Sequence, residues 1–400
     1  MKEQFRRKVL ANGMTILFEK RDIPVVSVAF AVKYGAINET VSEKGLAHFI
    51  EHMLYKGTPK RNWKEIAEEI EKNGGELNGF TGEMMTVYFC KMPSKHIDIA
   101  LEVLSDMVKN PLFDEKEIEK DRKVIFEEIK MHRDNPRLHV FDEIQKILYD
   151  GTLGINIIGT HETMNSIDRE KMIKKFKEIY KPNNMVLCVV GDVDFDKLVD
   201  FVEKNFKDKP GEKIPVQKFN LRNKSEVEKR KGIDQANLVF AHHVPLSTEK
   251  KSYAAKVLIT LLAGGMSSRL FSEIREKRNL AYSVKGDSMI TKDFSYNLVY
   301  VGTTKENVEL VKELILKEFK DVAENLDEKE LNAVKEQLIG NYQISMEDSQ
   351  TQMVNLLFSE VDGNAYDFYD FEEKIKNVEL KEVKELANLK DYSFFVLIPE

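Results

Sequence analysis

The sequence lacks the residues and patterns that define several common protein classes. It has only 2 cysteines, Cys90 and Cys188, and they form no Cys-x-x-Cys pair, so a disulfide framework and a thiolate zinc site are both excluded. Any bound metal must therefore be held by some of the 8 histidines and by carboxylates. No apolar run of about 18 residues is present, and the N-terminus reads as neither a signal peptide nor a transit peptide. We therefore expect a cytoplasmic protein in a reducing compartment, without a membrane span.

Proline and glycine are also scarce, and neither sign of charge dominates. There are 10 prolines and 20 glycines in 400 residues, and 61 Lys and Arg against 68 Asp and Glu give a net charge of −7. This balance provides no general attraction to nucleic acid or to an anionic membrane, so we expect neither as a partner. With 42% hydrophobic and 32% charged residues, the chain reads as a folded globular protein. Its length predicts two or three domains.

A long internal repeat is present in the chain. Residues 86–130 and residues 297–341 each contain a β-rich run, a polar turn, an amphipathic helix and then a second helix behind an Asp-Glu-Lys-Glu run. These runs begin at Asp114 and Asp327, where an aspartate can cap a helix and the following acids suit the positive end of its dipole. Strand–turn–helix units are common by themselves, but two units of equal length with the same internal order favour a duplication.

The order of the predicted elements indicates the fold class. Strand-like segments at residues 26–34 and 237–243 occupy similar places in the two halves. Strands cluster with helices without strict alternation, which predicts an α+β fold rather than a doubly wound sheet. Residues 207–217 are polar and contain two prolines and a glycine, so they form the predicted linker. We therefore expect two related domains, at residues 1–206 and 218–400.

The motif that carries chemistry is GLAHFIEHM at residues 45–53. His48 and His52 are four residues apart, so on a helix they share one face and can hold one Zn²⁺ with room for a third ligand and a water. Glu51 lies on the same side and can take a proton from the zinc-bound water without binding the metal. This order of residues is the inverted zincin pattern, His-x-x-Glu-His. The alternative is an ordinary helix whose histidines face solvent.

The wider segment at residues 35–58, GAINETVSEKGLAHFIEHMLYKGT, resembles the M16 metallopeptidase family. The resemblance implies an M16/LuxS-like fold, in which each domain is a mostly antiparallel sheet with helices packed on it. It also implies one zinc per chain and a third ligand, a glutamate that ends a downstream segment of pattern E-R-x-V-x-x-x-E. Residues 121–128 read DRKVIFEE here, which makes Glu128 the expected ligand and Glu127 the alternative. Asp121 stands where the family usually has a glutamate that supports the site.

The second half contains no comparable metal motif. Its counterpart of the metal-binding helix, LAGGMSSRLFSEIREK at residues 262–277, contains no histidine. When the repeat is aligned on Asp114 and Asp327, Asn341 falls opposite Glu128. We therefore expect the second copy to bind no metal, which also resembles the family, where one domain is catalytic and the other degenerate.

Two further segments resemble substrate-binding parts of the family. Residues 267–284 match the segment that carries an arginine and a tyrosine, here Arg275 and Tyr282, which would bind the substrate backbone and stabilise the developing oxyanion. The alternative pairs Arg275 with a nearby acid and buries Tyr282 in the core. Residues 74–81, GGELNGFT, resemble an edge strand to which an extended peptide adds through main-chain hydrogen bonds. The expected substrate-binding residues there are Asn78, Gly79 and Phe80, with Gly79 in place of the more usual alanine.

Together these features predict a zinc-dependent endopeptidase that acts on peptides bound in extended form. His48, His52 and Glu128 would hold the zinc, and Glu51 would accept a proton and deliver it to the leaving amine. In the family, two units enclose a chamber and each supplies the Arg/Tyr pair to the other's site, so we expect a homodimer, with a related subunit as the alternative partner. The competing functions are an inactive structural subunit and a zinc-dependent carrier that binds peptides without cleaving them.

Overall fold

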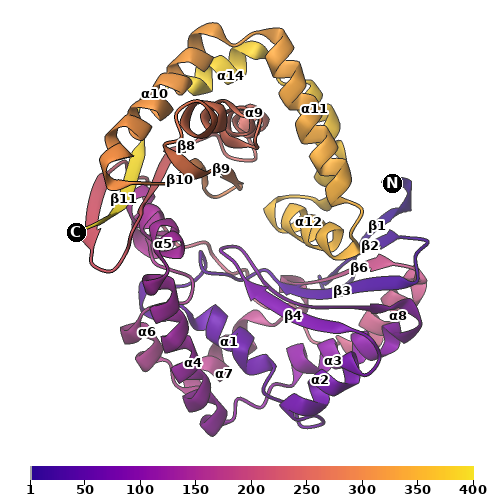
Figure 1. Cartoon of the computed structure of the whole chain (residues 1–400). Coiled ribbons are helices and arrows are strands. Elements are labelled where there is room, and N and C mark those ends of the chain that lie inside the picture. The colour runs from indigo at the N-terminus through magenta and orange to yellow at the C-terminus, as the bar shows by residue number, and fades with distance from the viewer. Residues whose placement is uncertain (1) are drawn as a thin grey trace. The chain divides into compact units, whose positions relative to one another are not determined.

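Two mixed sheets organise the chain, one in each of two compact units (Figure 1). The computed structural model describes residues 2–400. Unit 1 comprises Met1–Lys130, Gly151–Lys218 and Ser345–Tyr369, and unit 2 comprises Met131–Asp150, Phe219–Ile344 and Asp370–Glu400. Each unit therefore contains a segment from the other half of the chain: Met131–Asp150 belongs to unit 2, and Ser345–Tyr369 belongs to unit 1. The division into domains at residues 1–206 and 218–400 stays a prediction.

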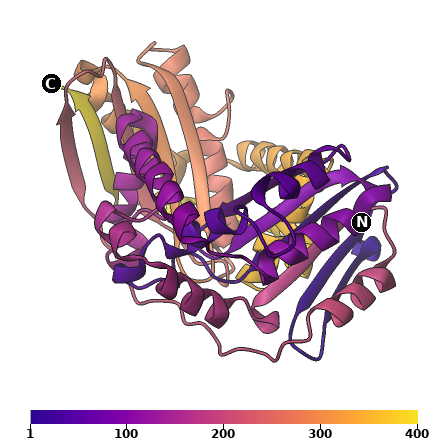
Figure 2. The same ribbon diagram turned by 90° about the horizontal axis from the view of Figure 1, so that it is seen from below.

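The sheet of unit 1 has six strands in the order β1-β2-β6-β3-β5-β4. The strands are β1 (Phe5–Val9), β2 (Thr15–Lys20), β3 (Val25–Val32), β4 (Glu76–Thr81), β5 (Thr86–Pro93) and β6 (Met185–Gly191). Neighbouring strands are antiparallel except β2 and β6, which are parallel. The N-terminal strands lie at one edge of this sheet (Figures 1 and 2), and β4 forms the other edge.

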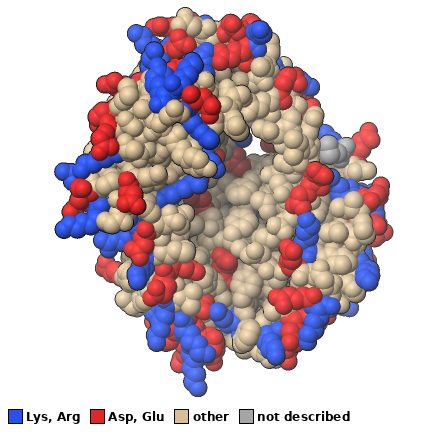
Figure 3. Space-filling model, viewed as in Figure 1, with Lys and Arg blue, Asp and Glu red and all other residues tan. Residues whose placement is uncertain are grey.

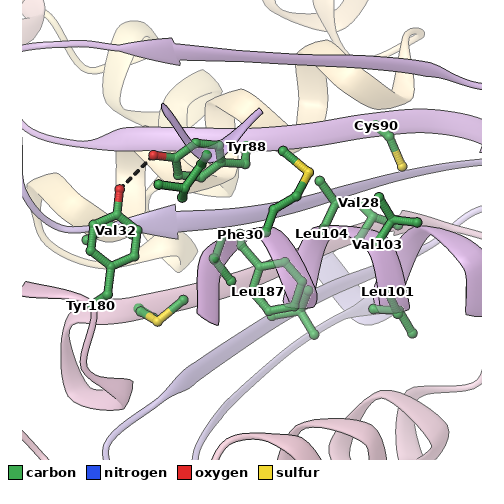
Figure 4. Packing of buried hydrophobic residues seen from close by; sticks show 14 of the residues in the cluster. Val28, Phe30, Val32, Tyr88, Cys90, Leu101, Val103, Leu104, Tyr180 and Leu187 are labelled. Carbon is green, nitrogen blue, oxygen red and sulfur yellow. Dashed lines mark hydrogen bonds between the residues drawn. The ribbon is translucent and has the colours of Figure 1, made fainter. Parts of the chain in front are cut away.

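One face of this sheet packs against helices and forms the core of unit 1. Because side chains alternate along a strand, the even-numbered residues of β3, from Val26 to Val32, all point into this core. Figure 4 shows part of it, including a 2.6 Å hydrogen bond between the hydroxyls of Tyr88 and Tyr180. The helices of this unit are α1 (Leu46–Leu54), α2 (Trp63–Glu71), α3 (Ile97–Lys109), α4 (Glu115–Asp134), α6 (His161–Ser166), α7 (Arg169–Ile179), α8 (Phe195–Asn205) and α12 (Ser349–Asp362).

Helix α12, which comes late in the chain, covers the other face of the first sheet by packing on β3 and β6. The amide of Gln352 donates a 2.6 Å hydrogen bond to the fully buried carboxylate of Glu19. The guanidinium of Arg7 donates two hydrogen bonds of 2.8 Å to Glu360. Since buried polar groups need partners, α12 completes the hydrogen bonding of Glu19, which also accepts from Arg21, and supplies the carboxylate that pairs with Arg7. Unit 1 thus depends on a segment from the second half of the chain.

Unit 2 has a five-stranded sheet in the order β7-β11-β8-β10-β9. The strands are β7 (Ser225–Arg230), β8 (Ala236–His243), β9 (Ala281–Ile290), β10 (Ser295–Thr303) and β11 (Ser393–Pro399). β7 and β11 are parallel, and the other neighbours are antiparallel. The helices are α5 (Pro136–Leu148), α9 (Ser252–Ala263), α10 (Val308–Asn325), α11 (Glu328–Ser345), α13 (Phe371–Lys376) and α14 (Leu380–Ala387). Helix α5, from the first half of the chain, packs on β8 and β11.

The predicted duplication is visible in the elements. β5, α3 and α4 follow one another in unit 1 as β10, α10 and α11 do in unit 2. The carboxylate of Asp114 accepts the backbone N–H of Lys116 at 2.9 Å, and that of Asp327 accepts the N–H of Glu330 at 2.9 Å, so both aspartates begin their helices as expected. The α+β class with two related, mostly antiparallel sheets is confirmed.

The charges on the surface and the apolar character of the helices agree with the composition of the chain. Figure 3 shows that basic and acidic side chains are interspersed over the visible surface. Among residues 2–400, no helix combines the length and the apolar character that crossing a bilayer requires.

The attachment of α12 gives a testable prediction. Arg7→Ala should lower the free energy of unfolding by about 3 kcal/mol, because it leaves the buried carboxylate of Glu360 without a compensating charge and with only the backbone N–H of Ala365, at 3.3 Å, as a hydrogen-bond donor. Lys8→Ala is the control: Nζ of Lys8 lies 4.0 Å from Glu203 and both side chains are exposed, so its effect should stay within about 0.5 kcal/mol. Urea unfolding measures both values. Equal losses for the two variants would contradict the inferred attachment.

Candidate metal centre

The structure brings His48, His52 and Glu128 together, two from α1 and one from α4. Nε2 of His48 lies 3.7 Å from one carboxylate oxygen of Glu128, and Nε2 of His52 lies 3.7 Å from the other. One donor atom from each residue lies within 4.8 Å of the others. Tetrahedral zinc, with bonds of about 2.1 Å, places its ligand atoms roughly 3.4 Å apart. The donor set and its spacing therefore fit a zinc ion. Among the described residues, the group includes Glu128 and not Glu127.

The start of α1 is fixed by a buried carboxylate. Glu39, which is 0% exposed, accepts the backbone N–H of Gly45 at 3.1 Å and that of Ala47 at 2.6 Å. These N–H groups belong to the first turn, where a helix has no internal partners for them. Gly45 has φ +90°, and a Cβ there would lie 2.4 Å from the side chain of Met164, so the entry to α1 requires glycine. Burial raises the pKa of Glu39 to about 7, although the Lys44 ammonium opposes this shift.

His52 is oriented by Asp121 on α4. Nδ1 of His52 lies 3.0 Å from a carboxylate oxygen of Asp121, which leaves Nε2 facing Glu128. Burial by itself would raise the pKa of Asp121, but hydrogen bonds from His52 and Lys56 hold it below its usual value. Burial likewise opposes protonation of His52, yet the Asp121 hydrogen bond and the Glu128 charge raise its pKa. A carboxylate on the far nitrogen of a metal-binding histidine is a common support of such sites, so the shorter aspartate still reaches its partner.

Glu51 lies beside this group without belonging to it. It is 8% exposed, and one of its carboxylate oxygens accepts a 2.7 Å hydrogen bond from the hydroxyl of Thr81 on β4. Burial raises the pKa of Glu51, although the Thr81 hydrogen bond opposes this shift. A Cβ at Gly79 would lie 2.3 Å from the hydroxyl of Tyr55 and 3.3 Å from Glu51. Glycine at this position therefore lets β4 approach α1 closely while Tyr55 is present.

Arg122 connects α4 to the backbone near the end of α6 and to the ring of Phe49 on α1. Its guanidinium donates to the backbone carbonyls of Met164 and of Ile167, the latter at 2.9 Å, and lies 5.4 Å from the ring centroid of Phe49 on α1. The sequence pattern gave no separate role to Arg122, Glu39, Lys56 or Thr81. All four lie within segments that resemble the family, which was the available signal. Their partners are distant in sequence or are backbone atoms, so the pattern alone did not reveal them.

The residues predicted to bind the substrate lie in unit 2 and on β4. Within unit 2, Arg275 lies on the π-helical segment η6 (Phe271–Glu276), with its guanidinium 5.1 Å from the ring centroid of Tyr282 and Nε 3.6 Å from Glu276. Tyr282 is 80% exposed, so the alternative that placed it in the core is wrong. On β4, Asn78 is exposed and its side chain accepts the N–H of Gly79 at 2.9 Å.

Comparisons with known proteins identify the family of the chain. Residues 15–161 match the family model "Insulinase (Peptidase family M16)", and residues 166–338 match "Peptidase M16 inactive domain". A protein of Rickettsia felis named an uncharacterized zinc protease is 33% identical over 87% of this chain and 85% of its own length. A Bacillus subtilis protein with the same description is 32% identical over 87% of this chain and 86% of its own.

Solved structures share the fold. A protease from Helicobacter pylori matches with a TM-score of 0.91 at 22% identity over 99% of both chains. An M16-like peptidase described as putative, from Alicyclobacillus acidocaldarius, matches with a TM-score of 0.87 at 19% identity over 99% of this chain and 98% of that one. The fold is thus that of an M16-type peptidase, and the chain belongs to the M16 peptidase family.

Glu39 gives a prediction for pH dependence. Its folded-state pKa of about 7 exceeds the ordinary value of 4.5, so between these values the folded state binds a proton that the unfolded state does not. Its contribution to stability is therefore complete at low pH and is lost as the pH rises toward 7. Glu39→Gln lacks this titration. Urea unfolding at pH 5, 6 and 7 should show wild type losing about 2 kcal/mol relative to Glu39→Gln between pH 5 and pH 7; a constant difference would contradict the assignment.

Proposed function

We propose that this protein is a zinc-dependent endopeptidase that hydrolyses peptides or unfolded segments held in extended form. The observation that carries the proposal is the grouping of His48, His52 and Glu128 beside a separate buried carboxylate, Glu51. Two relatives with more than 30% identity are named zinc proteases. The family model described as inactive covers residues 166–338, which include most of the second half, where the His-x-x-Glu-His motif is absent, so it favours no inactive role for the first half.

Each residue of the candidate centre has a distinct role in this proposal. His48, His52 and Glu128 would hold one zinc ion per chain. Zinc, when bound, supplies a Lewis acid that polarises the peptide carbonyl and lowers the pKa of a coordinated water toward neutrality. Thr81 holds one carboxylate oxygen of Glu51, so the other oxygen would accept the proton of the attacking water. The same oxygen would then deliver that proton to the leaving amine.

The edge strand β4 is the proposed docking strand for the substrate. One side of β4 pairs with β5 and the other has no strand partner among the described residues, so its main chain can add an extended peptide. Asn78, Gly79 and Phe80 would line that peptide. Arg275 and Tyr282 would bind the backbone of the substrate and stabilise the oxyanion.

We further propose that two copies of the chain form a homodimer that encloses the substrate. One chain carries both the metal-binding set and the Arg/Tyr pair. Two identical subunits could therefore build two composite sites, in which Arg275 and Tyr282 of one copy serve the metal centre of the other. A related subunit in place of the second copy is the alternative.

The proposed chemistry predicts how cleavage responds to Glu51. Glu51→Gln should lower peptide hydrolysis about a thousandfold, because the amide cannot accept the proton, while zinc binding is retained. A digest of an unstructured peptide, mapped by mass spectrometry with and without a chelator, measures cleavage, and elemental analysis measures zinc.

A matched pair of neighbours provides the control. Glu128→Gln should lose the zinc together with the cleavage, whereas Glu127→Gln, one residue away, should keep both. Cleavage that survives both the chelator and Glu51→Gln would refute the proposed function. Zinc binding without any cleavage by wild type would instead support a peptide carrier.

The homodimer predicts complementation between inactive variants. Protein with Glu51→Gln and protein with Tyr282→Phe should each be impaired as pure samples. After subunit exchange, a mixed dimer contains one site with neither change, so activity should rise to about a quarter of wild type for a statistical mixture, in which half the dimers are mixed. Activity is measured on the same peptide before and after exchange. No recovery after demonstrated exchange would contradict the shared site.

A further inference from the structure

The two faces of β4 have different surroundings. Gly79 and Thr81 lie on the face toward α1, where Thr81 bonds Glu51. Asn78 and Phe80 point to the opposite face, because side chains alternate along a strand. In the register with β5, Asn78 lies opposite Phe89, so these residues share the face of the sheet that α12 covers.

Three phenylalanines meet on this second face of unit 1. The ring of Phe80 stacks on that of Phe358 from α12, with centroids 6.2 Å apart and planes at 14°. It also meets the ring of Phe89 edge-on, with centroids 6.4 Å apart. Phe89 is only 7% exposed, whereas Phe358 is 39% exposed. We call these three residues the aromatic platform. Phe358 is its accessible member.

One ion pair lies beside the platform on this face. Lys91, two residues after Phe89 on β5, forms an ion pair with Asp348, which caps the start of α12. Asp348 accepts the N–H of Thr351 as well. The platform is thus flanked by a compensated pair, and its own surface is aromatic. Such a surface favours aromatic and aliphatic side chains, whereas a carboxylate placed against it would lose hydration without gaining a partner.

We propose that the aromatic platform selects an apolar side chain of the bound peptide, with Phe358 as the specificity-determining residue. The proposal rests on the proposed function, in which the peptide adds to the open edge of β4. Side chains of an added strand alternate between the same two faces as those of β4. When one substrate residue faces Glu51, its neighbour in the peptide faces the platform. We therefore expect a preference for an apolar residue at one position near the cleaved bond.

The test compares unstructured peptides that differ at one position near the cleavage site mapped in the digest. Phe, Leu, Ala, Lys and Glu are placed in turn at each of the positions flanking the cut, and kcat/KM is measured for each peptide. Wild type should prefer Phe or Leu over Ala about tenfold at one of these positions. Phe358→Ala should reduce that preference to less than about twofold. Leu310→Ala, 41% exposed on α10, is the matched control and should keep the preference.

A second variant separates selection from a general effect on folding. Phe358→Lys can keep its ammonium in water because the position is partly exposed, and it should move the preference from apolar residues to Glu at the same position. A merely structural role for Phe358 would not produce this exchange.

The outcomes distinguish the two proposals. The platform proposal is overturned if wild type cleaves in a chelator-sensitive manner but Phe358→Ala keeps the apolar preference. It is also overturned if such cleavage shows no apolar preference at any flanking position. In both cases the proposed function stands. If wild type cleaves no peptide, or if neither chelator nor Glu51→Gln affects cleavage, both are overturned.

Discussion

The contact between His52 and Asp121 joins the two helices that supply the candidate ligands, and much of unit 1 keeps that contact in place. Helix α1 is held at its first turn by Glu39, and α4 is held by Arg122, which also lies against Phe49 of α1. These supports are buried and polar, so each is favourable only when its partners are in position. The spacing of the three donors is therefore a property of the whole unit, and ligand placement within about half an ångström requires this kind of support.

The sequence indicated the local parts of this arrangement well. The four-residue spacing of His48 and His52 predicts a shared helix face, and helix-capping patterns at Asp114 and Asp327 predict two boundaries that the structure confirms. The interactions that the sequence did not indicate are the ones between distant residues. A carboxylate such as Glu39 reads as a surface residue until its partners are known. An alternating strand likewise shows that a face is buried but not which helix covers it, so the packing of α12 on β3 was not predictable.

The second copy shows how a duplicated domain can lose a metal motif and keep its helices joined. In unit 2, Arg269, next to η6, donates two hydrogen bonds of 2.8 and 2.5 Å to Glu330 on α11 and one of 2.5 Å to Asp321 on α10. Helix α11 is the counterpart of α4, so Arg269 and Glu330 connect the elements that the metal-binding residues connect in unit 1. Bidentate ion pairs of this kind are strong and directional. The fold can therefore persist while only the first copy carries the metal motif.

Helix α12 carries both the residues that attach it to the sheet and the residue proposed to select the substrate. All of these residues lie apart from the metal group. The residues that attach it to the sheet, Gln352 and Glu360, lie on its buried side, whereas Phe358 is partly exposed beside β4. None of them belongs to the metal group on the opposite face of the sheet. Substitution at Phe358 can thus change which side chain is accepted without disturbing Glu51 or its hydrogen bond to Thr81. Because the side chains of β4 alternate between these faces, one strand serves both the reaction and the choice of substrate.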